Sequence, residues 1–123
     1  MQKSPIVYIN NMPINQSNSE HYIWGEVCDG WHLLKTPNLS VIQERVPAGA
    51  GEQMHLHSVA QQFFYILSGS AALEFETETI VISAGEGLYV PPNSRHCFKN
   101  LSQEEVNFLV ISNPSTTGDR TNI

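Results

Sequence analysis

Hydrophobic and polar residues alternate in short segments along most of this chain, in a pattern typical of β-strands. The clearest segment is Ala71–Glu78, where Leu73 and Phe75 alternate with glutamates, so one of its faces is expected in the core and the other in solvent. Glycine and proline clusters separate the segments. The expected strands are Pro5–Ile9, His21–Val27, Gly30–Thr36, Leu39–Val46, Gln53–His57, Gln62–Leu67, Ala71–Glu78, Thr79–Ser83, Leu88–Val90, Arg95–Asn100 and Val106–Ser112.

These strands predict an all-β fold. About ten short strands at a spacing of roughly 8–12 residues are typical of a sandwich or a jelly-roll barrel, and the pattern alone leaves that choice open. The pair Asp29-Gly30 predicts a hairpin turn between the second and third strands. We expect an N-terminal strand or arm over residues 1–20, a barrel over 21–112 and a flexible C-terminal tail over 113–123.

The composition indicates one soluble domain. The chain has 123 residues, of which 41% are hydrophobic and 15% charged, enough to bury one core and too apolar for a disordered chain. The net charge is −6 and the basic residues are scattered, which argues against a nucleic acid or a membrane as partner. The two cysteines form no CxxC pair, and we expect a reduced, cytoplasmic compartment and no signal peptide.

The first candidate for chemistry is a pair of histidines, His55 and His57, separated by one residue. On an extended strand the two side chains project from the same face, roughly 7 Å apart at Cα. Two imidazoles placed in this way can converge on one divalent transition-metal ion. A lone pair of this kind is also found among ordinary surface or core histidines, so the pair alone does not establish a metal site.

Two spaced motifs surround this pair. The first consists of Gly51, His55, His57, Gln62 and Gly69. The second consists of Gly85, Pro91, Asn93, His96 and Asn100. In order and spacing they resemble the two motifs of the cupin family, with glutamine at a position where glutamate is usual and asparagine at a position where glycine is usual. Because asparagine tolerates positive φ better than most residues, Asn93 suits the same turn.

The resemblance to a small, single-domain cupin implies a double-stranded β-helix, a jelly-roll barrel of two packed antiparallel sheets. It also implies one divalent metal ion, whose ligands would be His55, His57, Gln62 and His96. Three imidazoles and an amide suit Ni, Zn, Mn, Fe or Cu, so the identity of the metal stays open. Small cupins of this type are commonly homodimers that exchange an N-terminal strand, a part that would suit Pro5–Ile9.

Gln62 distinguishes this candidate site from the usual one. An amide oxygen is a weaker, neutral ligand than a carboxylate, so a bound ion would keep its full charge. We therefore expect a stronger Lewis acid that favours anionic substrates and holds its metal less tightly. The adjacent Gln61 is one residue out of phase and is expected to point away.

Strand parity selects the residues expected around the substrate. Phe64 and Ile66 share the facing of Gln62, and Phe98 shares that of His96, so we expect these three residues to line the pocket beside the metal. The catalytic residues stay unknown, with Tyr89 and Glu44 as the candidates for an acid–base role.

Three functions stay open, each with a small molecule as ligand. The first is a metalloenzyme that acts as a Lewis acid on a small polar or acidic metabolite, as an isomerase, lyase or tautomerase. Small cupins of the pectin-degradation type, which rearrange unsaturated uronates, resemble this sequence in using glutamine at the fourth ligand position. The second is an Fe(II)-dependent dioxygenase, and the third a non-catalytic binding or sensing module. Because cupins host many chemistries, the site must decide among them.

Overall fold

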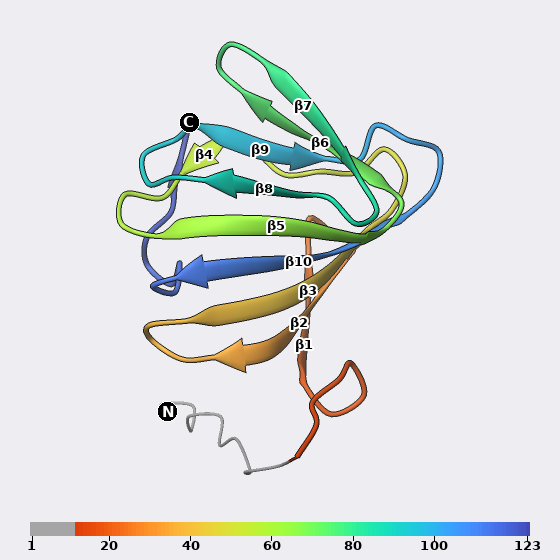
Figure 1. Ribbon diagram of the computed structural model, residues 1–123, viewed down its shortest axis with the longest axis vertical. Coiled ribbons are helices and arrows are strands. Elements are labelled where there is room, and N and C mark those ends of the chain that lie inside the picture. Colours follow the sequence, from red (N-terminus) through yellow and green to blue (C-terminus); the bar gives the residue numbers. More distant parts are fainter. Residues whose placement is uncertain (1–11) are drawn as a thin grey trace.

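The computed structural model describes residues 12–123. Within this range the regular elements are all strands, joined by loops, and there is no helix (Figure 1). The strands are β1 (Glu20–Trp24), β2 (Cys28–Lys35), β3 (Ser40–Val46), β4 (His55–Leu56), β5 (Gln61–Ser68), β6 (Ser70–Phe75), β7 (Thr79–Ser83), β8 (Gly87–Val90), β9 (His96–Lys99), β10 (Val106–Asn113) and β11 (Thr121–Asn122). The all-β prediction is confirmed, whereas the expected strand Pro5–Ile9 lies outside the described residues. Within 12–123, no helix has the length and apolarity to span a membrane.

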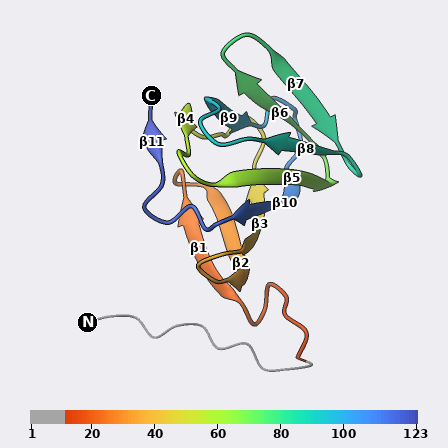
Figure 2. The ribbon, with the colours of Figure 1, turned by 60° about the vertical axis from the view of Figure 1, so that its left-hand side comes forward.

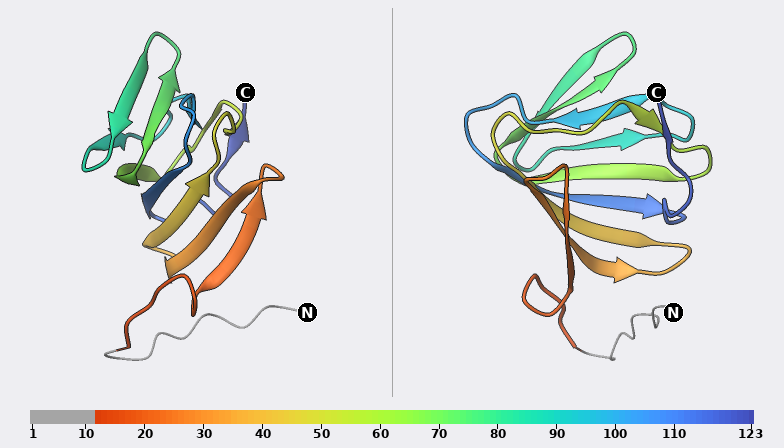
Figure 3. Two further views of the ribbon diagram at one scale, coloured as in Figure 1. Left: turned by 90° about the vertical axis from the view of Figure 1, so that its right-hand side faces the viewer. Right: turned by 180° about the vertical axis from the view of Figure 1, so that it is seen from behind.

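The strands form two antiparallel sheets, as expected of a jelly-roll barrel. One sheet has six strands in the order β1-β2-β3-β10-β5-β8, and the other has five in the order β11-β4-β9-β6-β7. Neighbours in each sheet are mostly distant in the sequence, because the chain crosses repeatedly from one sheet to the other. Figures 1 and 3 show the two sheets from different sides, with the N-terminal strands at the bottom and the β6–β7 hairpin at the top.

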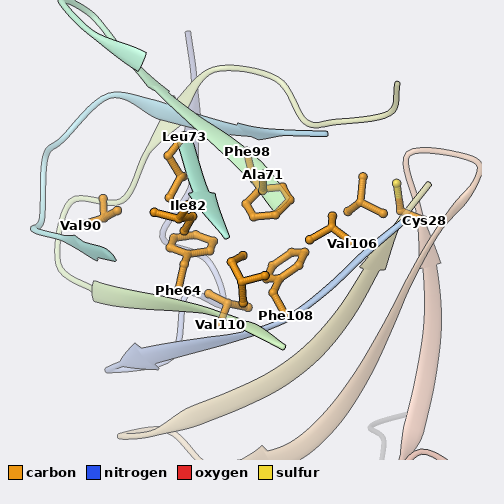
Figure 4. Packing of buried hydrophobic residues seen from close by; sticks show 12 residues of the cluster. Cys28, Phe64, Ala71, Leu73, Ile82, Val90, Phe98, Val106, Phe108 and Val110 are labelled. Carbon is orange, nitrogen blue, oxygen red and sulfur yellow. The ribbon is translucent and has the colours of Figure 1, made fainter. Parts of the chain in front are cut away.

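The hydrophobic core lies between the two sheets (Figure 4). Along β5, Phe64 and Ile66 are buried while their neighbours in sequence are exposed, as period-two alternation predicts. Phe108 of β10 pairs with Ile66 and stacks on Phe98 of β9, with 4.0 Å between ring centroids. The contact between Phe98 and Phe108 therefore joins the five-stranded sheet to the six-stranded one.

The first hairpin turns earlier than the Asp29-Gly30 pair predicts. Its loop follows Trp24, with Gly25 and Glu26 at φ values of 57° and 71°, while Asp29 and Gly30 lie inside β2. Gly30 is required there for space, since a Cβ atom on it would lie 2.2 Å from the ring of Tyr22. The glycine that indicated a turn in the sequence thus serves a close side-chain contact.

The C-terminal residues return to the barrel. The sequence pattern suggests a flexible tail over residues 113–123, but in the structure the chain after β10 runs along one end of the barrel and pairs with β4 through β11 (Figures 1 and 2). The backbone N–H of Ile123 also donates to the carbonyl of Met54, at 3.0 Å. The physical reason is that β4 would otherwise be an edge strand with unpaired backbone groups. Hydrophobic periodicity does not report this kind of pairing.

Candidate metal site and pocket

Three histidines meet at one end of the barrel. His55 begins β4, His96 begins β9, and the two residues are direct partners in the pairing of these strands. His57 follows β4 directly. One ring nitrogen from each of the three residues lies within 4.8 Å of the others, and all three side chains are buried. The structure thus brings together the pair from the first motif and the histidine from the second.

Backbone carbonyls orient all three rings. The Nδ1 atoms of His55 and His96 each lie 2.8 Å from the carbonyl oxygen two residues earlier, and Nδ1 of His57 lies 2.6 Å from the carbonyl oxygen of Asp119. Because a carbonyl only accepts, each neutral ring must carry its proton on Nδ1. Each Nε2 atom then presents a lone pair, and that of His96 is buried with no hydrogen-bond partner. Such an arrangement fits a metal ion.

The electrostatics of the three rings agree with this geometry. Burial lowers the pKa of His55 to about 3, and it also lowers the pKa values of His57 and His96. The nearby Arg120 guanidinium acts in the same direction on all three rings. The imidazoles are therefore neutral near pH 7, which is the form that binds metal.

Gln62, the fourth expected ligand, has a buried amide oxygen. Its side chain on β5 is buried, and its Nε2 donates to Oγ of Ser112 at 3.1 Å. That bond orients the amide and leaves Oε1 buried without a hydrogen-bond partner. Buried polar atoms are rarely left unpaired, so a group that accepts electron density from Oε1 would fit here. His55, His57, His96 and Gln62 together match the donor set of a divalent transition metal.

A pocket of about 250 Å³ opens next to this cluster. His55, His57 and Gln62 line it, together with the apolar side chains of Phe64 and Phe98. Three ionisable side chains also line the pocket: Glu44 from β3, Glu52 from the loop before β4, and Arg120 from the C-terminal segment. A mixed wall of this kind suits a small polar ligand.

The remaining residues expected at the site lie elsewhere. Ile66 is fully buried in the core and does not line the pocket. It has the facing of Phe64 but lies two residues further from the barrel end that holds the histidines. Tyr89 is 52% exposed and donates to Oε1 of Gln61 at 2.9 Å, outside the pocket. The alternation of side chains predicted on which face of its strand each residue lies, but not how far the residue lies from the barrel end that holds the histidines.

Glu44 is hydrogen-bonded to Tyr22, a residue that the sequence did not single out. The Tyr22 hydroxyl donates to Oε2 of Glu44 at 2.8 Å. In the sheet, Gly30 pairs with Tyr22 on one side and with Glu44 on the other, so the Tyr22 side chain reaches across Gly30. Burial raises the pKa of Glu44 to about 8, against a lowering effect of the Tyr22 hydrogen bond, and burial also raises the pKa of Tyr22.

Two further pocket residues that the sequence did not indicate are Glu52 and Arg120. Oε1 of Glu52 accepts from the backbone N–H of Phe98 at 3.0 Å and lies 3.9 Å from Nε2 of His55. Its Oε2 lies 3.5 Å from Nη1 of Arg120. Burial raises the pKa of Glu52 to about 7. Both residues belong to segments without periodicity, so hydrophobic patterning carried no signal for them.

Comparison with known proteins identifies the family. Residues 42–112 match the family model described as Cupin domain. An uncharacterised protein of Streptomyces coelicolor is 31% identical over 88 residues, covering 70% of this chain and 82% of that protein.

Solved structures agree on the fold. The structure of KdgF from a Halomonas species has a TM-score of 0.76 at 20% identity, covering 85% of this chain and 95% of that one. The structure of Pac13, described as a nucleoside dehydratase, has a TM-score of 0.73 at 20% identity, covering 89% of this chain and 88% of that one. The family match spans more than half of the sequence and carries both histidine motifs. This chain therefore belongs to the cupin family.

Proposed function

We propose that this cupin is a metal-dependent enzyme that acts on a small acidic metabolite, as an isomerase, lyase or tautomerase. The observation that carries the proposal is the convergence of three buried, neutral imidazoles whose Nδ1 atoms are all held by carbonyls. His55, His57, His96 and Gln62 would hold the ion. A divalent ion bound there would supply Lewis-acid polarisation of a substrate oxygen.

Glu44 is the proposed proton-transfer residue. One of its carboxylate oxygens is held by the Tyr22 hydroxyl at 2.8 Å, which fixes the side chain at the pocket wall and leaves the other oxygen for a substrate. Its pKa of about 8 allows both protonation states near neutral pH, as general acid–base catalysis requires. Tyr22 keeps its proton because its own pKa is raised, so it acts as a fixed hydrogen-bond donor.

Arg120 is the proposed contact for the acidic group of the substrate. Among the described residues that line the pocket it is the single cationic side chain. A guanidinium binds carboxylates through two parallel hydrogen bonds. The neutral amide of Gln62 adds to this preference, because it leaves the charge of a bound ion uncompensated.

The pocket volume and the relatives are consistent with this proposal. A volume of about 250 Å³ suits a metabolite rather than a drug-sized ligand. Pac13 is described as a nucleoside dehydratase, and a dehydratase belongs to the lyase class. The resemblance of the Gln62 position to cupins that rearrange unsaturated uronates suggests these acids as first substrates to test.

Metal content tests the metal part of the proposal. Protein purified without a polyhistidine tag and without added metal is expected to contain about one divalent ion per chain by elemental analysis, and the His96→Ala variant much less. His21→Ala is the matched control, because the His21 side chain is 41% exposed and does not line the pocket. Little metal in the wild type, with no change on His96→Ala, would overturn the metalloenzyme assignment.

Turnover tests the chemical part. Unsaturated uronates and 1,3-diketones are incubated with protein loaded with Ni, Mn, Fe(II) or Zn. We expect conversion of a uronate without oxygen uptake, and a loss of about 10²–10⁴-fold in kcat for Glu44→Gln. Oxygen consumption with Fe(II) would instead indicate a dioxygenase. Binding of these compounds without turnover would indicate a non-catalytic binding or sensing module.

A further inference from the structure

The three histidines of the cluster differ in the origin of the carbonyl that orients them. His55 and His96 donate to carbonyls two residues earlier in their own segments. His57 donates to Asp119, which is 62 residues away in the sequence and belongs to the C-terminal segment. The orientations of His55 and His96 are therefore set locally, whereas that of His57 depends on where the C-terminal segment lies.

The carboxylate of Asp119 holds that segment in place. Its Oδ1 accepts from the backbone N–H of Ser58 at 2.8 Å, its Oδ2 accepts from that of Ala60 at 2.9 Å, and both oxygens lie within 3.3 Å of the backbone nitrogen of Val59. These three consecutive N–H groups directly follow His57. A carboxylate that accepts several backbone N–H groups forms strong, charge-assisted hydrogen bonds, in agreement with the lowered pKa of Asp119.

Further contacts extend from Asp119 to the end of the chain. Thr121 and Asn122 pair with Leu56 and His55 as β11. Nη2 of Arg120 lies 3.4 Å from the carbonyl oxygen of Gln53. We call residues 119–123 the C-terminal strap, since they contact the chain on both sides of the histidine pair. Figure 2 shows β11 lying alongside β4 at this edge.

We propose that the C-terminal strap is a positioning element of the metal site: docking of Asp119 selects the Nδ1-protonated tautomer of His57 and so directs its Nε2 into the cluster. The part of this proposal that concerns metal rests on the proposed function, whereas the tautomer is a property of the protein alone. Asp119 does not line the pocket and acts through its contact with His57, so it is a positioning residue. Partners of this kind typically affect metal affinity by about 10–100-fold.

The first experiment measures the histidine tautomers in metal-free protein. Long-range ¹H–¹⁵N NMR spectra distinguish protonation at Nδ1 from protonation at Nε2. In the wild type we expect all three rings to be protonated at Nδ1. In Asp119→Ala we expect His57 alone to become a mixture of tautomers, while His55 and His96 keep theirs because their carbonyl partners are local.

The second experiment measures Co²⁺ affinity by the visible absorption of the bound ion. We expect Asp119→Ala to weaken Co²⁺ binding by about tenfold or more. Asp119→Asn keeps the shape and one acceptor oxygen, so we expect a smaller loss. Glu86→Ala is the matched control, because Oε1 of Glu86 also accepts from a backbone N–H, that of Ser83, at 2.8 Å in the turn between β7 and β8. That turn lies at the end of β8 away from Gln62.

The two experiments separate this proposal from the proposed function. If wild-type protein binds no Co²⁺, the metalloenzyme proposal fails, and the tautomer of His57 in Asp119→Ala still decides the role of the strap. An unchanged His57 tautomer in folded Asp119→Ala would overturn the positioning role. A loss of Co²⁺ affinity of the same size in Glu86→Ala would overturn it too, since the effect would then be one of general stability.

Discussion

At the scale of single residues, Gln62 determines how much of the charge of a bound ion the protein neutralises. We expect Gln62→Glu to tighten Co²⁺ binding by about tenfold, or roughly 1.4 kcal/mol, because a carboxylate neutralises part of the ion's charge. The Ser112 hydroxyl, which now accepts from Gln62, can donate to the new carboxylate. Calorimetric titration of metal-free protein with Co²⁺ measures the change.

The neighbouring glutamine supplies a matched control for this substitution. Gln61→Glu adds the same charge one residue away, on the exposed face of β5. Its effect on Co²⁺ affinity is expected to be small, since the side chain contacts Asn113 and Tyr89 rather than the pocket. An equal gain in both variants would show that the overall charge of the protein, and not ligation by residue 62, controls the affinity.

The second residue-scale prediction concerns Glu44 and pH. Its pKa is raised to about 8 by burial, above the value in an unfolded chain, so between these two pKa values the folded state holds a proton that the unfolded state releases. Stability therefore decreases as pH rises through this window, by up to about 1.4 kcal/mol per pH unit. Urea unfolding at pH 5, 6.5 and 8 should show that Glu44→Gln removes this part of the pH dependence.

A parallel pH dependence in the wild type and Glu44→Gln would contradict the assignment of the proton to Glu44. Tyr22→Phe offers an independent check. The Tyr22 hydrogen bond lowers the pKa of Glu44, so its removal is expected to extend the loss of stability to higher pH.

At the scale of elements, two non-glycine residues in turns of the described range 12–123 have positive φ. Glu26 in the β1–β2 loop has a φ of 71°, and Asn93 before β9 has a φ of 65°. Positive φ costs an L-residue roughly 1–2 kcal/mol, and less for asparagine. We expect Glu26→Gly to raise the free energy of unfolding by up to about 1 kcal/mol, because the relieved strain exceeds the added chain entropy, and Asn93→Gly to raise it less. Urea unfolding measures both changes.

The control for these substitutions is Gln103→Gly, an exposed residue in the turn before β10 whose φ is not positive. Glycine there only increases the entropy of the unfolded chain, so a loss of about 0.4–1 kcal/mol is expected. If Glu26→Gly destabilised the protein by a similar amount, the strain assigned to the β1–β2 loop would be absent in solution.

The elements also differ in how well the sequence predicted them. Period-two alternation located β5 and β10 within a few residues, because buried side chains alternate there with more accessible ones. The pattern also located β6, although Ala71, Ala72 and Leu73 are all buried there, so that both faces of this strand are covered. The β1–β2 turn was misplaced, since a glycine has the same signature whether it forms a turn or makes room for a ring. β11 was missed because two backbone-paired residues with exposed side chains leave no hydrophobic pattern.

At the scale of the whole molecule, a bound ion is expected to stabilise the fold. The ion would cross-link strands β4, β5 and β9, and a ligand that binds only the folded state at a hundred times its Kd adds about 2.7 kcal/mol. For a domain of this size we expect a rise in Tm of roughly 10 °C with Co²⁺, reversed by a chelator. In His96→Ala the rise should disappear, so an equal rise in that variant would contradict binding at the three-histidine cluster.

The homodimer implied by the cupin resemblance stays a prediction at this scale. The outer face of β5 exposes Phe63, Tyr65 and Leu67 in succession, and apolar side chains gathered on one face are common at interfaces. Light scattering coupled to size exclusion is expected to give twice the chain mass, and a monomer mass at all concentrations would refute the dimer.

The sequence by itself determined the all-β class and the two motifs that bring His55, His57, His96 and Gln62 to one end of a barrel. It could do so because alternation and motif spacing are properties of neighbouring residues. The tertiary structure alone decided that Glu44 meets Tyr22 across a glycine, that Glu52 and Arg120 enter the pocket wall, and that Asp119 orients His57. These contacts join distant segments, such as those of Asp119 and His57, which are 62 residues apart. They depend on strand order and register, which local patterning does not encode.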